Sequence, residues 1–189
     1  MLKYTFSILS FTLVLSVSAQ SFSLSGQVLT DTDDPAGSVL LEVLDEQDEV
    51  VATQLTDCSG NYLFEDLTGG TEFTVRVSKE GSPLNGNSTF DLVLISKYLL
   101  GSGELENSYR ISAADIDESG SISVLDLLRM RALILGIQQA YPGSNWLFFR
   151  PGDQQASSAF DIVLTADLSN YDLITIKKGD VNGSAFPCE

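Results

Sequence analysis

The chain has 189 residues, 10 basic and 26 acidic side chains and no histidine, so its formal net charge is −16. This acidic excess argues against binding to nucleic acids or anionic membranes, which attract Lys and Arg. The lack of histidine excludes Ser-His-Asp and Cys-His catalysis and histidine-ligated zinc, and two cysteines cannot build a four-cysteine zinc site. Hydrophobic residues make up 43% of the chain, a proportion typical of globular proteins.

Residues 1–19 have the features of a secretory signal peptide. Lys3 supplies a positive charge, residues 4–17 are mostly apolar, and residues 17–19 end the segment with the small side chains of Ser18 and Ala19. The apolar run is too short for a membrane span. We therefore expect cleavage after Ala19 and a secreted or cell-surface protein, in a compartment where disulfides can form.

Residues 20–79 have the pattern of a β-sandwich. Clusters of Gly, Asp and Asn separate short β-prone runs at residues 22–28, 39–44, 50–53, 62–64 and 73–77. This spacing predicts antiparallel strands in two packed sheets. Residues 56–67, with Gly69, Gly70 and Phe73 after them, resemble the turn and strand of carboxypeptidase-regulatory-like (transthyretin-like) domains. That resemblance implies an accessory module with no chemistry of its own.

Two segments of helical length, residues 90–100 and 125–135, repeat each other at an offset of 35 residues (Asp91 to Asp126). The matching residues are Asp91, Leu92, Leu100 and Gly101 in the first segment and Asp126, Leu127, Leu135 and Gly136 in the second. The glycines stand where helices commonly end. We predict a duplicated loop–helix unit over residues 80–140. Because its helices are apolar on most sides, we expect them to be buried against each other and against a sheet.

Residues 115–126 match the spacing of a calcium-binding loop. Ca²⁺ binds six to eight oxygen atoms, which a twelve-residue loop supplies from positions 1, 3, 5, 7, 9 and 12. Those positions hold Asp115, Asp117, Ser119, Ser121 (through its carbonyl oxygen), Ser123 (through water) and Asp126. Gly120 stands where such a loop turns sharply, and Ile122 is expected to point into the core. The pattern predicts a Ca²⁺ site.

The corresponding loop of the first repeat, residues 80–91, matches this pattern poorly. Its side-chain oxygens at ligand positions come only from Glu80, Ser82 and Asp91. Leu84 occupies the fifth position and the polar Asn87 the eighth, where Ile122 stands in the second repeat. We therefore expect a weak metal site here or none.

After residue 140 the β pattern returns, with strand candidates at residues 146–149, 160–164 and 173–176. We expect residues 141–189 to pack on the preceding loop–helix unit, with Trp146, Phe148 and Phe149 in the core. In the tail, Asp180 and Asn182 repeat the opening of a calcium loop. They either lend oxygens to the deficient first site or form an Asx turn, which is the interpretation that we favour.

The loop of residues 115–126 differs from an EF-hand in two details, because its twelfth residue is Asp and residues 111–114 are too few for a full entering helix. A duplicated unit of one loop and one helix resembles the dockerin family. The motifs STFDLVLISKYLLG, SGSISVLDLLRMRALILG and GDVNGSA make residues 21–185 most similar to dockerin-like segments of secreted Bacteroidetes-type proteins. The resemblance implies a calcium-stabilised module without catalytic activity. In cellulosomal dockerins the helices bind a cohesin.

The fold class that we predict is therefore mixed α and β, with an antiparallel sandwich joined to a duplicated Ca²⁺-loop–helix unit and additional C-terminal strands. We expect no enzymatic activity. The expected function is attachment to an extracellular protein partner, with Ca²⁺ as a structural ion. The alternative is a subunit that binds copies of itself in an extracellular filament or matrix.

Cys58 and Cys188 are the two cysteines of the chain. We favour a disulfide within one chain because it needs no partner and would hold the C-terminal tail. A bridge between copies, which would suit a filament, and two free thiols are the alternatives.

Overall fold

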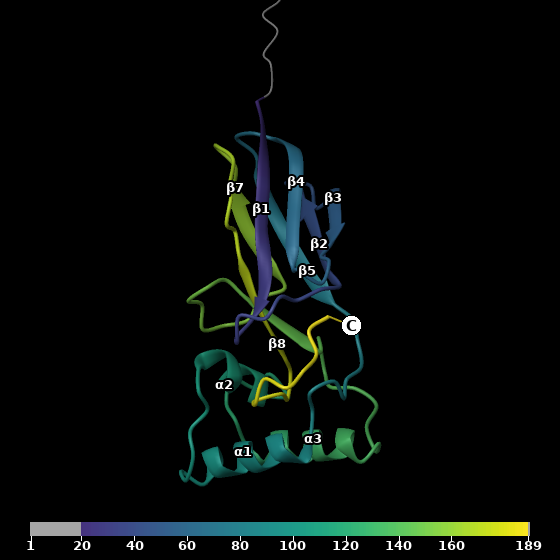
Figure 1. The fold of residues 1–189 in the computed structure, drawn as a ribbon, viewed down its shortest axis with the longest axis vertical. Coiled ribbons are helices and arrows are strands. Elements are labelled where there is room, and N and C mark those ends of the chain that lie inside the picture. The colour runs from purple at the N-terminus through teal and green to yellow at the C-terminus, as the bar shows by residue number, and fades with distance from the viewer. Residues whose placement is uncertain (1–19, 189) are drawn as a thin grey trace, which may run out of the picture.

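The computed structural model describes residues 20–188, so the predicted signal peptide at residues 1–19 lies outside the described part. Figure 1 shows an elongated molecule with a β-sandwich at one end and three helices at the other. No helix within residues 20–188 is long and apolar enough to cross a membrane.

The sandwich consists of two four-stranded sheets with the strand orders β4-β1-β8-β6 and β3-β2-β5-β7. The first sheet contains β1 (Ser21–Thr30), β4 (Asn61–Thr68), β6 (Trp146–Phe149) and β8 (Leu173–Lys177). The second contains β2 (Val39–Leu44), β3 (Val50–Leu55), β5 (Glu72–Lys79) and β7 (Ala159–Val163). All neighbouring strands pair antiparallel except β1 and β8, which are parallel. The predicted mixed fold with an antiparallel-rich sandwich is confirmed at this level.

Alternation along the strands builds the core between the sheets. In β5, Phe73, Val75 and Val77 point inward and are buried, as the period of two requires. Trp146 and Phe148 of β6 lie in the same core, whereas Phe149 packs with Ala113 and Ile176 in a smaller cluster beside the helices. The expectation that all three β6 aromatics lie in the core is confirmed.

The C-terminal strands do more than pack on the loop–helix unit, because they also complete the sandwich. β8 extends the first sheet along β1, and β7 pairs with β5, where Phe73 lies opposite Ile162. Without them, β1 and β5 would be sheet edges with unpaired backbone groups and partly uncovered apolar faces. Phe149 of β6 and Ile176 of β8 also pack against Ala113 of α2, and Val181 after β8 joins the core of the helices.

Helices α1 (Thr89–Leu99) and α3 (Val124–Ile134) confirm the predicted duplication, with bounds one residue earlier than expected. Ser88 and Ser123 form capping boxes with Asp91 and Asp126 at the helix N-termini.

The structure adds a short helix, α2 (Ser108–Ala114), in front of the calcium-type loop. Residues 111–114 alone are too few for a full entering helix, so the sequence did not predict α2, which starts earlier, at Ser108. Its start is set by Asn107, whose side chain accepts a hydrogen bond from the backbone N–H of Arg110 at 2.9 Å.

Helices α1 and α3 pack against each other as expected, but α2, the loop and the tail cover their inner faces in place of a sheet. Their inner faces form a core cluster with Ile95, Met130, Leu133 and residues of α2, the loop and the tail. Their outer faces stay exposed, because α2 and the tail occupy the space between these helices and the sandwich and no other part of residues 20–188 covers the other side (Figure 1).

Candidate metal centre

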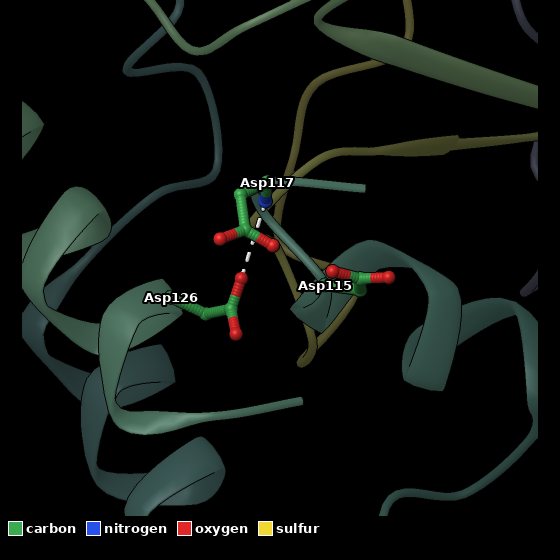
Figure 2. Close-up of side chains that lie close together, drawn as sticks. All are labelled: Asp115, Asp117 and Asp126. Atoms are coloured by element: carbon green, nitrogen blue, oxygen red, sulfur yellow. Dashed lines mark hydrogen bonds between the residues drawn. The ribbon is translucent and has the colours of Figure 1, made fainter. Parts of the chain in front are cut away.

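Three carboxylates meet between the end of α2 and the start of α3 (Figure 2). Asp115, Asp117 and Asp126 each offer an oxygen, and these oxygens lie within 4.8 Å of one another. This trio could hold a metal ion, and it is the only group of three or more acidic, Cys or His side chains found so close together within residues 20–188. Asp126 is completely buried in the first turn of α3, whereas Asp115 and Asp117 are partly exposed.

Backbone N–H groups fold the loop around these carboxylates. Asp115 accepts hydrogen bonds from Ser119 N at 3.0 Å and from Gly120 N at 2.7 Å. Asp126 accepts one from Asp117 N at 3.1 Å, which ties the two ends of the loop together. Gly120 has a φ of 85°, a left-handed conformation that glycine adopts without steric cost, and it allows the sharp turn predicted at this position.

The serine oxygens predicted as ligands lie along the same loop. The Ser119 hydroxyl donates a hydrogen bond to the Ser121 carbonyl at 3.0 Å and lies 3.4 Å from Asp115. The Ser123 hydroxyl accepts from Leu125 N at 3.1 Å and donates to Asp126 at 3.0 Å, so it caps the helix. Ile122 packs against the helical core, as expected of the eighth position.

The charges around the loop leave an excess of negative charge. Arg129 is the basic side chain nearest to the trio in the ion pairs observed, and its Nε lies 3.7 Å from the Asp117 carboxylate. The fully buried Lys178 pairs with Glu118 of the same loop. Carboxylates that share a site repel each other and lose hydration, so a bound cation would stabilise this arrangement.

No protein-family model matches the chain, and no curated protein is similar to it in sequence. The resemblance to dockerins and to carboxypeptidase-regulatory-like domains therefore stays a prediction, and the geometry of the site carries the functional argument.

The loop of the first repeat, residues 80–91, for which we expect a weak metal site or none, contributes no residue to the acidic trio found within residues 20–188. Glu80 and Ser82 are exposed, and none of the acidic trios of residues 20–188 includes Asp91. Asp91 is fully buried and accepts a hydrogen bond from Val181 N at 3.0 Å. Its loop is thus closed by the C-terminal tail and not by residues 80–85.

In that tail, Asp180 repeats the hydrogen bonds of Asp115. Its carboxylate accepts from Ser184 N at 3.1 Å and Ala185 N at 2.6 Å, four and five residues ahead, as Asp115 does from Ser119 and Gly120. Asn182 N also donates to it at 3.3 Å, so the predicted Asx turn is present. The turn lies beside the first repeat, and the donation of Asp180 oxygens to a metal there stays a prediction.

The surroundings of Asp180 disfavour its charged form. Burial and the charge of Asp91 raise the pKa of its carboxyl, whereas hydrogen bonds from backbone N–H groups lower it. The net effect is a pKa above the ordinary value. Burial and the same Asp91 charge raise the pKa of the Tyr141 hydroxyl. The side-chain oxygen of Asn182 is buried and has no hydrogen-bond partner. Asp91 and Asp180 thus lie close to each other, and Asn182 follows Asp180 in the same turn.

Sequence reasoning missed the contact of Lys178 with the metal-type loop. Its ammonium group is fully buried, pairs with Glu118 and donates to the Pro142 carbonyl at 2.7 Å. No local signal could reveal this contact, because it joins residues 60 positions apart. The structure also joins Cys58 and Cys188 within the chain, with their Cα atoms 5.4 Å apart.

Sequence reasoning also missed the exposed outer stripes of α1 and α3. They consist of Phe90, Val93 and Leu100 on the first repeat and Leu125, Leu128 and Leu135 on the second, all at least 47% exposed. The three positions match at the offset of 35 residues. The sequence could have indicated these stripes, because both repeats have large apolar residues at more positions than one buried helix face requires.

Proposed function

We propose that the protein is a secreted, non-catalytic module that attaches to another extracellular protein through the outer faces of α1 and α3, with Ca²⁺ as a structural ion. The observation that carries this proposal is the coincidence of a possible metal site with an unpartnered apolar surface. Asp126 belongs to the acidic trio and to α3, and Leu125 and Leu128 on the same helix are exposed.

In this proposal Ca²⁺ takes oxygens from Asp115, Asp117, Ser119, Ser121 and Asp126, with Ser123 acting through water. The ion would offset the repulsion among the carboxylates and fix the start of α3 relative to the end of α2. A second and weaker site would use Asp91, Asp180 and Asn182, and it would hold the tail against α1. The buried, unpaired oxygen of Asn182 supports that second site.

The outer stripes supply the binding surface. Residues at i, i+3 and i+10 lie on one side of a helix, and Lys97 and Ala132 stand at i+7 between them. Together the six side chains expose large apolar groups on neighbouring helices, and clusters of exposed large apolar residues mark protein-interaction sites in soluble proteins.

The Ca²⁺ part of the proposal is tested by thermal unfolding in Ca²⁺ and in EDTA. If Ca²⁺ binds only the folded state, it raises the free energy of unfolding by about 2.7 kcal/mol at a free Ca²⁺ concentration a hundred times Kd. We expect Asp126→Asn to abolish most of the Ca²⁺-dependent rise in melting temperature. Asp91→Asn is the matched control, because it perturbs the equivalent capping box, and it should retain most of the rise. Equal losses in both variants, or no response in the wild type, would contradict the proposal.

The attachment part is tested by capture from the extracellular fraction of the source cells. Immobilised wild-type protein in Ca²⁺ should retain a specific protein that a Val93→Ser, Leu128→Ser variant does not. Both substitutions lie in the outer stripes and leave the acidic trio intact. Equal retention by wild type and variant would show that the outer stripes are not the binding surface.

A further inference from the structure

The outer faces of α1 and α3 differ in charge from the opposite end of the sandwich. Within α1 and α3 the only acidic residues are Asp91 and Asp126, which are both buried. Lys97 and Arg131 are exposed on these helices, beside the apolar stripes. In a chain of net charge −16, this helical face is therefore apolar and basic.

The opposite end of the sandwich is acidic. Pairing of Leu44 with Thr74 places the β2–β3 turn at the end of the sheet where β5 begins, which is the end away from the helices (Figure 1). Exposed acidic residues gather there on the β2–β3 turn and on the neighbouring ends of β4 and β5: Glu46, Asp48, Glu49, Glu65, Asp66 and Glu72. We call this surface the distal end.

The distal end also offers apolar surface. Val50 and Val51 at the start of β3 are 46% and 50% exposed, and Val163 at the end of β7 is 59% exposed. A partner that carries exposed Leu, Val and Phe side chains among basic groups could bury them here while pairing its charges with the carboxylates.

We propose that the helical face of one copy binds the distal end of a second copy. This inference rests on the proposed function, because it names the partner of the same helical face. Opposite charges on the two surfaces favour a head-to-tail contact and raise its association rate. A symmetric contact between two helical faces would instead bring two faces of the same positive sign together.

A head-to-tail contact leaves one free surface at each end of the assembly. Interfaces of this heterologous kind form rings if the rotation closes and open filaments if it does not. Wild-type protein in Ca²⁺ should therefore grow in mass with concentration and not stop at a dimer. In 1 M salt, where the Debye length is about 3 Å, the association should weaken markedly.

The test uses two variants, each with one altered surface, in sedimentation velocity with Ca²⁺. Lys97→Glu with Arg131→Glu alters the helical face, and Glu46→Lys with Glu49→Lys alters the distal end. Each variant alone should stay monomeric, whereas an equimolar mixture should associate, because every copy then meets an intact complementary surface. Both variants should keep the Ca²⁺-dependent melting shift of the wild type, which shows that they fold.

Three results would overturn the inference. They are a wild type that stays monomeric at every concentration, a distal-end variant that associates alone, and a mixture that does not recover association. The proposed function fails separately, through loss of the Ca²⁺ response or of stripe-dependent capture. A monomeric wild type that keeps both properties would refute self-assembly and leave attachment to a different protein.

Discussion

Arg110 joins the helical part of the molecule to the sandwich through a buried ion pair. Its Nε lies 2.7 Å from the carboxylate of Asp31, and the two side chains are only 6% and 2% exposed. Asn107 donates a second hydrogen bond to the same carboxylate at 3.0 Å. Arg110 also contacts Glu106 at 2.7 Å, but the Glu106 side chain is 75% exposed. The guanidinium group of Arg110 thus pairs with one buried carboxylate and one solvent-exposed carboxylate.

We predict that Arg110→Ala lowers the free energy of unfolding by about 3–5 kcal/mol, because it leaves Asp31 buried without its counter-charge. Glu106→Ala is the matched control and should cost at most about 1 kcal/mol, since exposed ion pairs contribute little. Urea unfolding of the two variants measures both values. Similar losses of unfolding free energy in the two variants would show that the buried Arg110–Asp31 pair contributes no more than the exposed Arg110–Glu106 pair.

At the scale of elements, the duplication extends beyond the residues that match in the sequence. Both helices start in a capping box, and both end in a Schellman-type motif with Gly101 or Gly136 at a positive φ of 65° or 71°. In that motif Ser102 N donates to Lys97 O, and Ile137 N donates to Ala132 O, each at 2.9 Å. The repeat therefore preserves backbone geometry as well as side chains.

We predict that Gly101→Ala and Gly136→Ala each destabilise the fold by about 1–2 kcal/mol, the cost of a left-handed conformation for a residue with a Cβ. No atom lies within 4 Å of a Cβ placed at either position, so the cost is conformational and not steric. Asn substitutions should cost less, because Asn visits this conformation more readily. Denaturant unfolding of the four variants checks the order; Asn variants as unstable as Ala would contradict it.

At the scale of the whole molecule, the C-terminal tail connects the helical end to the sandwich. Asp180 and Val181 lie beside α1, and Asn85 holds Phe186 through two hydrogen bonds of 2.8 and 2.9 Å. The disulfide of Cys58 and Cys188 then fixes the end of the tail to the sandwich. Tail, loop and sandwich thus form one connected structure.

We predict that Cys188→Ser lowers the stability of the native protein by roughly 4–5 kcal/mol in the chain-entropy model, because the disulfide spans 130 residues and restrains the unfolded chain. Cys58→Ser should cost about the same, since either change breaks the same bond. On a non-reducing gel the wild-type monomer should migrate faster than its reduced form. A ladder of species that collapses with reductant would contradict an intramolecular bond.

The sequence alone determined the features that depend on short-range rules. Strand alternation, helix termini and the twelve-residue spacing of residues 115–126 follow from backbone geometry over a few residues, so they could be predicted. The positions of Asp115, Asp117 and Asp126 around one point belong to this group, because a single turn and the start of a helix bring them together.

Only the tertiary structure decided which distant segments meet. The parallel pairing of β1 with β8, the contact of Val181 with Asp91 and the burial of Lys178 against Glu118 each join residues far apart in the chain. Many alternative pairings satisfy the same local patterns. The choice among them depends on which arrangement covers the sheet edges and buries the apolar faces together, and that is a property of the whole chain in space.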